Sequence, residues 1–440
     1  MVIFNFSVLC MAPQMGSNNT GPVHTYSPLD QTYLMYAIGF GSLLGTFPFT
    51  YSFSRFGTRY IFTAAGFLSV ISTALIPMAS SYGLNAFLVV RFLQGVSYSA
   101  DFAAIGMLTS IWASLKQHAL FLSLLTCYSP LSSTLTNAVS GYLCESSLGW
   151  PSIYYFHSAV GAILFTYWFV TYTDHPATSN WVSPIELEKI ERNKAKEELE
   201  FSGNMPYWQI CKNPVVLTVW FNAFIEISSG IFLLIYTPIY LNKVHGFGLV
   251  ETGLLSSLPP LVAIPLRILF GVISDKIKFW SERTKMNVFN TFSAFGPAVF
   301  YLAVVLVRSS TAAICMLFSI HIFYAGSGGG FYKCATLSCR QFSPFVIANI
   351  QFIKCLTLFF APSLYGFFVK DESSSEQWNH IFITMSITLA IATVSFLFFS
   401  TDTPQPFTHV KKDNVDVDLS TISEDLSLKN NNGVDVGLRH

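Results

Sequence analysis

Long apolar windows recur along the whole chain and are separated by short polar loops. Each window spans about 18–25 residues, the length that an α-helix needs to cross the hydrocarbon core of a bilayer. The pattern predicts about eleven full membrane spans. A transmembrane barrel would instead need alternating segments of about ten residues. The windows lie at 31–51, 60–79, 84–112, 119–143, 152–172, 214–240, 251–273, 287–307, 311–332, 344–369 and 378–400.

The chain opens on an apolar run, residues 1–12, that is too short to cross a bilayer. No basic residue precedes this run, which disfavours a secretory signal peptide. We interpret it as the C-terminal end of a first helix that is truncated in this chain.

The longest internal polar stretch, 173–213, divides the spans into six and six when the first remnant is counted. Within it, 185–200 carries opposite charges one turn apart and predicts a solvated helix under the membrane. The expected fold class is all-α, a polytopic membrane protein of two six-helix bundles. We expect an N-terminal bundle over 1–172, a cytoplasmic loop over 173–213, a C-terminal bundle over 214–400 and a disordered cytoplasmic tail over 401–440.

Composition and charge agree with this architecture. Hydrophobic residues make up 52% of the chain and charged residues 11%, whereas a soluble domain carries about 25% charged residues. The 24 basic and 24 acidic residues cancel, so no basic excess is present to bind nucleic acid. The short outer loops carry Lys243, Arg308 and Lys370, while most other basic residues crowd the inner loops. This bias orients the C-terminus to the cytoplasm.

Other chemistry is sparse. Eight cysteines in 440 residues do not make a disulfide scaffold, and because only Cys144 falls near the outer face we expect no disulfide framework. Asn18 begins an Asn-Asn-Thr sequon in the first outer loop, which predicts a glycan and a plasma, endolysosomal or vesicular membrane. No nucleophile–base constellation or metal-ligand spacing stands out, so we expect neither an enzyme nor a cofactor or metal site.

Two inner loops carry related motifs. The loop at 54–59 reads Ser-Arg-Phe-Gly-Thr-Arg, and the loop at 271–276 reads Gly-Val-Ile-Ser-Asp-Lys. Together they resemble the G-x-x-x-D-[RK]-x-G-x-[RK] loop of the major facilitator superfamily, once per half. The resemblance implies that these loops hold an inner gate during alternating access. The candidate gating residues are Arg55, Gly57, Arg59, Gly271, Asp275 and Lys276.

Further segments narrow the resemblance. They are Arg-Phe-Leu-Gln-Gly at 91–95, Gly-Trp-Pro-Ser-Ile-Tyr-Tyr at 149–155, the run 238–247 and the run 253–259. From about residue 5 to residue 400 the chain resembles the organic-anion/sodium-phosphate cotransporter family, which includes sialin and the vesicular glutamate transporters. The resemblance implies a secondary transporter for a small organic or inorganic anion. Its other partners would be a proton or sodium ion and the lipid bilayer.

The chain also departs from that family. Ile3 stands where members usually have an Arg in the first helix, and Tyr98 stands where the glutamate transporters have a Glu in span 4. The named substrates therefore do not transfer to this chain. These departures support a second hypothesis, a non-transporting membrane receptor or regulatory protein.

Five formal charges fall inside the predicted spans, where each costs about 2.5–3.5 kcal/mol at the bilayer centre. The Arg91 guanidinium suits a carboxylate or phosphate and matches the family's span 4 Arg. Asp101 can replace the missing Glu as a protonatable group. Both also have a structural interpretation as internal ion pairs. The five are Arg91, Asp101, Glu226, Arg267 and Lys354.

Glu226 and Lys354 lie at similar predicted depths, which allows a pair that breaks when substrate binds or a purely structural salt bridge. His321 at mid-depth is either a proton relay or a hydrogen-bonded core histidine. Arg267 is expected to gate or to snorkel toward the inner surface. The candidate substrate and coupling residues are Arg91, Tyr98, Asp101, Glu226, His321 and Lys354.

Overall fold

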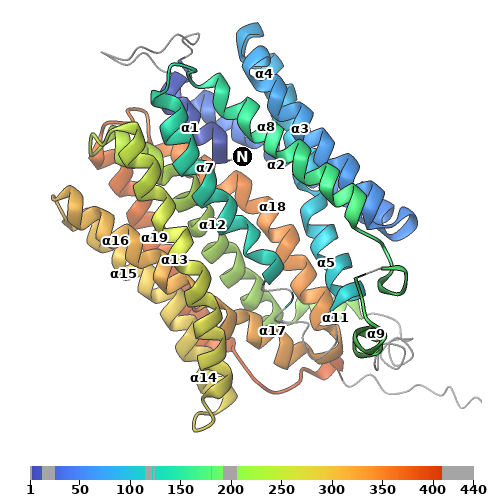
Figure 1. The fold of residues 1–440 in the computed structure, drawn as a ribbon. Coiled ribbons are helices and arrows are strands. Elements are labelled where there is room, and N and C mark those ends of the chain that lie inside the picture. Colours follow the sequence, from blue (N-terminus) through green and yellow to red (C-terminus); the bar gives the residue numbers. More distant parts are fainter. Residues whose placement is uncertain are drawn as a thin grey trace, which may run out of the picture.

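The computed structural model describes residues 2–11, 25–113, 121, 124–179, 181–191 and 206–408. These residues are built from helices and loops, with no strand among them (Figure 1). Within this part of the chain, eight helices are long and apolar enough to cross a membrane. The expected all-α, multi-pass membrane fold is therefore confirmed.

The first part of the chain supplies helices that match the predicted windows closely. Window 84–112 corresponds to two consecutive helices, with the single residue Ser99 between them. Residues 114–120 of window 119–143, and Asn18, lie outside the described residues. The helices are α1 (Val2–Met11), α2 (Pro28–Phe56), α3 (Thr58–Tyr82), α4 (Leu84–Tyr98), α5 (Ala100–Trp112), α7 (Tyr128–Glu145) and α8 (Pro151–Thr171).

The second part follows a short connecting region. Of the predicted helix at 185–200, the described portion is α9 (Pro184–Glu191), and the rest lies outside the described residues. Window 287–307 contains a π-helical turn, Thr291–Phe295. The helices are α11 (Tyr207–Lys212), α12 (Pro214–Lys243), α13 (Leu249–Lys276), α14 (Glu282–Asn290), α15 (Gly296–Leu306), α16 (Ser310–Tyr324), α17 (Phe331–Cys339), α18 (Ser343–Phe368) and α19 (Ser375–Phe399).

Local sequence explains where these helices begin. Ser27 and Asp30 form a reciprocal capping box, and Pro28 occupies the first turn of α2. The Asn213 side chain accepts hydrogen bonds from the first backbone N–H groups of α12. Gly57 and Gly83 adopt φ of 80° and 107° at the two sharp turns between α2, α3 and α4, a region that glycine enters at little cost.

Small residues let helices of the first half approach closely. α2 packs on α4, and at this crossing a Cβ added to Gly95 would collide with the Ile38 backbone. A Cβ added to Gly41 on α2 would likewise collide with the Phe92 backbone carbonyl of α4. Glycine at a helix crossing brings two backbones together, which is how membrane helices gain packing energy without a hydrophobic driving force.

The two halves join along two helix pairs, α7 with α13 and α2 with α18. Where α7 meets α13, the Thr134 hydroxyl donates to the Ser257 carbonyl at 3.1 Å, and the Ser257 hydroxyl donates to the Thr134 carbonyl at 3.0 Å. Nearer the outer end, Gly141 faces Gly253. The Val250 N–H donates to Glu145 at 3.3 Å. These contacts lie toward the outer ends of both helices.

Hydrogen bonds also join the second helix pair, α2 with α18, toward its outer end. Tyr36 on α2 and Ser363 on α18 share a hydrogen bond of 2.6 Å. One turn further out, Glu372 accepts from the Gln31 amide at 2.7 Å and from the Tyr365 hydroxyl at 2.6 Å. In the described part of the chain, hydrogen bonds between the halves gather on the outer side. The molecule is therefore closed at the end that the loop charges predict to be the outer one, and "outer" and "inner" are used below in that sense.

A disulfide between Cys10 and Cys144 ties α1 to α7. Our expectation of no disulfide framework is thus wrong to the extent of this one bridge. Sequence analysis assigned Cys10 to a membrane span. In the structure Cys10 lies at the C-terminal end of α1, opposite the outer end of α7.

The start of the tail is packed rather than disordered, which corrects the expectation for residues 401–408. Phe407 is buried against Phe342, with ring centroids 6.0 Å apart. The Gln405 N–H donates to the Ser338 carbonyl at 2.9 Å, and the Asn213 amide donates to the Gln405 side chain at 3.0 Å. Residues 409–440 lie outside the described residues.

Candidate substrate and coupling site

Arg91 is sealed inside the first half of the molecule. It is 1% exposed on α4. Its Nη1 donates to Gln94 Oε1 at 3.0 Å, and its Nη2 to Met35 Sδ at 3.1 Å. The Phe4 ring covers the guanidinium, with its centroid 4.6 Å from Cζ. A cation–π contact and a neutral amide lower the cost of burial without cancelling the charge.

The Nε–H group of Arg91 is buried and makes no hydrogen bond within the described residues. Tyr154, whose hydroxyl shares a 2.6 Å hydrogen bond with Ser7, lies within electrostatic range. A full charge with an unmatched donor is a costly arrangement to keep for structure alone. Arg91 therefore remains a candidate for contact with an anion.

Asp101 and Lys354 come from opposite halves and face each other. Asp101 lies in the first turn of α5, and Lys354 is near the middle of α18. Both side chains are half-buried, and their charges are within electrostatic range of each other. The sequence predicts Glu226 as a partner of Lys354. In the structure Lys354 instead lies within electrostatic range of Asp101.

Two tyrosines complete this cluster. Tyr98 ends α4 and lies next to Asp101, and Tyr128 at the start of α7 lies beside both of them. Ser99, between α4 and α5, keeps helical dihedrals, and its N–H still donates to the Gly95 carbonyl at 3.2 Å. Tyr98 and Asp101 are therefore held about one turn apart on a continuous helical path. We define Tyr98, Asp101, Tyr128 and Lys354 as the central cluster.

Glu226 sits in a polar network inside the second half. It is 8% exposed on α12 and accepts a 3.1 Å hydrogen bond from the Ser293 hydroxyl. Ser293 belongs to the π-helical turn, and π turns are frequent at functional sites. Arg267 on α13 lies within electrostatic range of Glu226. Glu226 and Lys354 therefore have different charge partners.

Arg267 and His321 occupy neighbouring helices of the second half. The Arg267 side chain is exposed although its position is in the inner half of a span, which fits a water-filled inner cavity or snorkelling. His321 on α16 is half-buried, and its Nδ1 lies 3.1 Å from the Leu317 carbonyl oxygen. That carbonyl only accepts, so Nδ1 carries the proton and Nε2 of a neutral ring is an acceptor.

The first inner loop is organised by a residue that sequence analysis missed. Asp174 follows α8 and accepts from the backbone N–H groups of Thr58 and Arg59 at 2.7 and 2.9 Å. It thereby caps the N-terminus of α3, where negative charge is favoured. A Cβ on Gly57 would lie 2.6 Å from Asp174 Oδ2. The sequence signal for this role of Asp174 is its position as an acidic residue immediately after a predicted span.

The arginines of this loop face different partners. Arg59 Nε donates to the Phe169 carbonyl at 2.8 Å, and its guanidinium lies over the Phe169 ring. Arg55 is exposed and contacts the Tyr51 hydroxyl at 3.3 Å. The loop is thus tied within the first half, through Gly57, Arg59 and Asp174.

The second inner loop ends α13. Gly271 and Lys276 are exposed, and the side chain of Asp275 lies outside the described residues. Beyond this loop, Glu282 at the start of α14 pairs with Lys333 at 3.0 Å and with Lys285 at 2.5 Å. Lys333 was not among the site residues predicted from the sequence.

The family model described as Major Facilitator Superfamily matches residues 1–362. Among curated proteins, the chain is similar to a probable small intestine urate exporter of Mus musculus, at 25% identity over 86% of this chain and 77% of that protein. It is also similar to sodium-dependent phosphate transport protein 1 of Mus musculus, at 25% identity over 88% of this chain and 83% of that protein.

Among solved structures, the chain resembles a bacterial homologue of the human lysosomal transporter Spinster, in an inward-facing and occupied conformation. The TM-score is 0.67 at 14% identity, covering 92% of this chain and 96% of the other. At this identity the likeness concerns the fold. The family resemblance drawn from the loop motifs and span segments is confirmed by these matches.

Proposed function

This chain belongs to the Major Facilitator Superfamily, and we propose that it is a secondary active transporter of a small organic or inorganic anion. The observation that carries the proposal is the meeting of Asp101 and Lys354 from opposite halves of the molecule. Such a pair changes strength when the halves move. A ligand that replaces one partner shifts the balance between the two conformations.

The sign of the charge supports an anion. Within the spans, three basic side chains stand against Asp101 and Glu226. Lys354 is half-buried and Arg267 is exposed, so both are available to a ligand that enters from the inner side. The names of the two mouse relatives refer to urate and phosphate, which are anions at neutral pH. Basic side chains near the boundary between the halves would raise the local concentration of such ligands.

We infer a coupling role for Asp101. When Asp101 takes up a proton, Lys354 loses its counter-charge and becomes free to bind the anion. When the anion leaves, Asp101 ionises and pairs with Lys354 again. Proton and anion then move together, which is symport driven by a proton gradient. A sodium gradient is the second candidate for the driving force.

The proposed moving units are the bundles 1–172 and 214–400, connected by 173–213. Contacts of α2 with α18 and of α7 with α13 close the outer side in this conformation. The inner loops would close in the alternate conformation, with Gly57 and Asp275 as gate residues. The proposed location is a plasma, endolysosomal or vesicular membrane, with the C-terminus in the cytoplasm and a glycan on Asn18.

Uptake into proteoliposomes tests the proposal. Labelled phosphate, urate and a series of organic acids are offered under an imposed proton or sodium gradient. We expect accumulation of at least one anion, and its loss in Lys354→Gln. Arg308→Gln, which removes an exposed outer cation, is the matched control and should transport normally. If folded wild-type protein accumulates no anion under either gradient, the receptor hypothesis replaces this one.

A further inference from the structure

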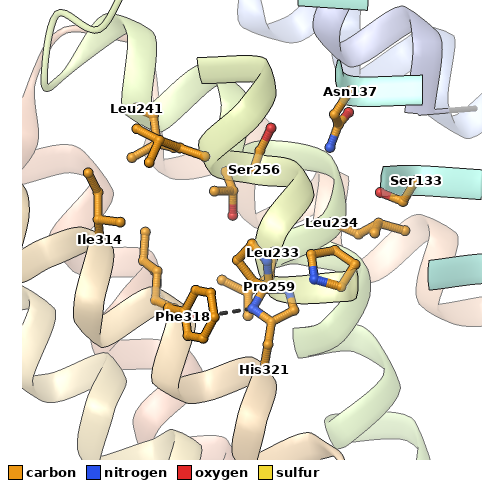
Figure 2. A pocket seen from close by; sticks show the side chains of 14 residues that line it. Ser133, Asn137, Leu233, Leu234, Leu241, Ser256, Pro259, Ile314, Phe318 and His321 are labelled. Atoms are coloured by element: carbon orange, nitrogen blue, oxygen red, sulfur yellow. Dashed lines mark hydrogen bonds between the residues drawn. The ribbon is translucent and has the colours of Figure 1, made fainter. Parts of the chain in front are cut away.

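A small cavity lies between the two halves, where α7 of the first half meets α12, α13 and α16 of the second (Figure 2). Its free volume is about 10 Å³, which is enough for one water-sized species. Ser133 and Asn137 line it from α7, and His321 lines it from α16. Figure 2 shows these side chains on opposite sides of the space. The cavity is separate from the central cluster, whose residues do not line it.

The oxygens that line this cavity lack partners. Ser133 Oγ, Asn137 Oδ1 and Thr237 Oγ1 are buried and make no hydrogen bond within the described residues. Ser133 is fully buried and Asn137 is 1% exposed. Each unmatched buried polar group costs about 1–3 kcal/mol. Three of them around one cavity indicate a site that holds something polar.

Prolines add backbone oxygens to the same site. A proline within a helix has no N–H to offer the carbonyl four residues earlier. Pro238, Pro259 and Pro260 are inside α12 and α13. They leave the carbonyls of Leu234, Leu255 and Ser256 without a helical donor, and all three of these residues line the cavity.

The histidine contributes an acceptor as well. His321 gives its Nδ1 proton to the Leu317 carbonyl, so the neutral ring presents the Nε2 lone pair. The Arg267 charge lies within electrostatic range of His321 and also of Glu226.

We propose that this cavity is a binding site for a monovalent cation of the size of sodium. Oxygen ligands from hydroxyls, an amide and released carbonyls suit a hard cation, and carbonyls freed at helix breaks coordinate coupling ions in transporters. A divalent ion would call for carboxylates, and among the described residues no carboxylate lines this cavity. An anion would face repulsion from the carbonyls. The proposal rests on the transport function above and assigns a place to a coupling ion.

The position of the site gives it a mechanical consequence. Its ligands come from α7 on one side and from α12, α13 and α16 on the other, so the site is complete only while the outer side is closed. A cation bound there stabilises the outward-closed conformation by mass action. Sodium entering from outside would thus promote closure behind itself.

Sodium binding to the full-length protein in detergent tests the site. Equilibrium binding of labelled sodium is measured together with the thermal midpoint in sodium, potassium and choline salts at equal ionic strength. Chloride and gluconate are compared to separate cation from anion effects. We expect saturable sodium binding and a higher midpoint in sodium than in choline, with either anion. Thr237→Val, which removes the oxygen at nearly constant volume, and Ser133→Ala should each weaken sodium binding at least 10-fold.

Ser140→Ala is the matched control. Ser140 is also buried with an unpartnered hydroxyl on α7, but it does not line the cavity, so sodium binding should be retained. Equal midpoints in sodium and choline, as for a site that holds only water, would overturn the inference. Undiminished sodium binding in both Thr237→Val and Ser133→Ala would do the same.

Anion uptake by the same preparations separates this inference from the proposed function. Proton-driven anion accumulation without sodium binding would contradict the cation site and support the proposed transport function. Selective sodium binding without anion accumulation under any gradient would support the cation site and remove the anion transporter.

Discussion

Arg91 and Lys354 are both cations inside membrane spans, but their surroundings are opposite. Arg91 is fully buried within one half, under a Phe4 ring and against Gln94 and Met35. Lys354 is half-buried at the boundary between halves and faces Asp101. A charge enclosed by one rigid bundle keeps its neighbours when the bundles move. A charge at the boundary exchanges its neighbours when the bundles move. Only a charge of this kind has interactions that differ between the two conformations.

Breaking the boundary pair should have the largest effect. Asp101→Asn takes the negative charge away from Lys354 and removes the group that we propose carries the proton. We expect gradient-driven uptake to fall roughly 100-fold or more, which corresponds to about 3 kcal/mol. Uptake into proteoliposomes measures this.

The exchanged pair sharpens the test. Combining Asp101→Lys with Lys354→Asp keeps opposite charges within electrostatic range across the boundary. The double variant should therefore be more thermally stable than either single exchange. A double variant no more stable than the singles would show that the two charges do not interact.

Replacing Arg91 should separate stability from activity. Arg91→Met removes a buried charge with an unmatched Nε and keeps an unbranched side chain, so thermal stability should be retained or rise, by up to about 1–3 kcal/mol. Anion uptake should fall at least 10-fold. Thermal unfolding and uptake are measured on the same preparation. Full uptake by the folded variant would assign Arg91 a structural role.

The inner gate offers a comparison between two glycines. Gly57 and Gly83 both have positive φ, but a Cβ on Gly57 would meet Asp174, whereas a Cβ on Gly83 has nothing within 4 Å. Each Ala substitution costs about 1–2 kcal/mol of backbone strain. Gly57→Ala should cost a further 1 kcal/mol or so, because it displaces the cap of α3. Equal shifts of the thermal midpoint in the two variants would contradict the role of Asp174.

A smaller effect is expected from a loop histidine on the outer side. Burial lowers the pKa of His245 below its ordinary value of 6.5, and its Nε2 is buried without a partner within the described residues. As the pH falls below 6.5, His245 is therefore protonated first in the unfolded chain, and the free energy of unfolding decreases. The loss should be under about 1 kcal/mol, since the side chain is partly solvated.

His245→Gln removes that titration. Between pH 7.5 and 5, the thermal midpoint of this variant should fall less than that of the wild type. The exposed His380, changed to Gln, is the control and should leave the pH dependence as in the wild type. An identical pH slope in all three proteins would contradict the effect of burial.

Much of the fold was predictable because membrane spans are local features. Windows such as 60–79 and 378–400 became α3 and α19 with ends within a few residues. The loop motifs placed the chain in its superfamily. The sequence also marked five charges inside the predicted windows, because a charge in an apolar window is visible without knowing its neighbours.

Partners were not predictable in the same way. Successive residues of a helix point about 100° apart, so depth along a span says little about the direction of a side chain. Glu226 and Lys354 have similar depths, yet Glu226 faces Ser293 and Arg267. The Asp174 cap and the Cys10–Cys144 bridge likewise join residues more than a hundred positions apart.

The sequence by itself determined that this protein crosses a membrane many times and which costly charges its predicted spans carry. Both follow from hydropathy, which is a property of short segments. Only the tertiary structure decided that Asp101 meets Lys354, that Phe4 covers Arg91, and that unpartnered oxygens surround one small cavity. Those depend on the rotation and packing of helices from both halves, which no single segment specifies.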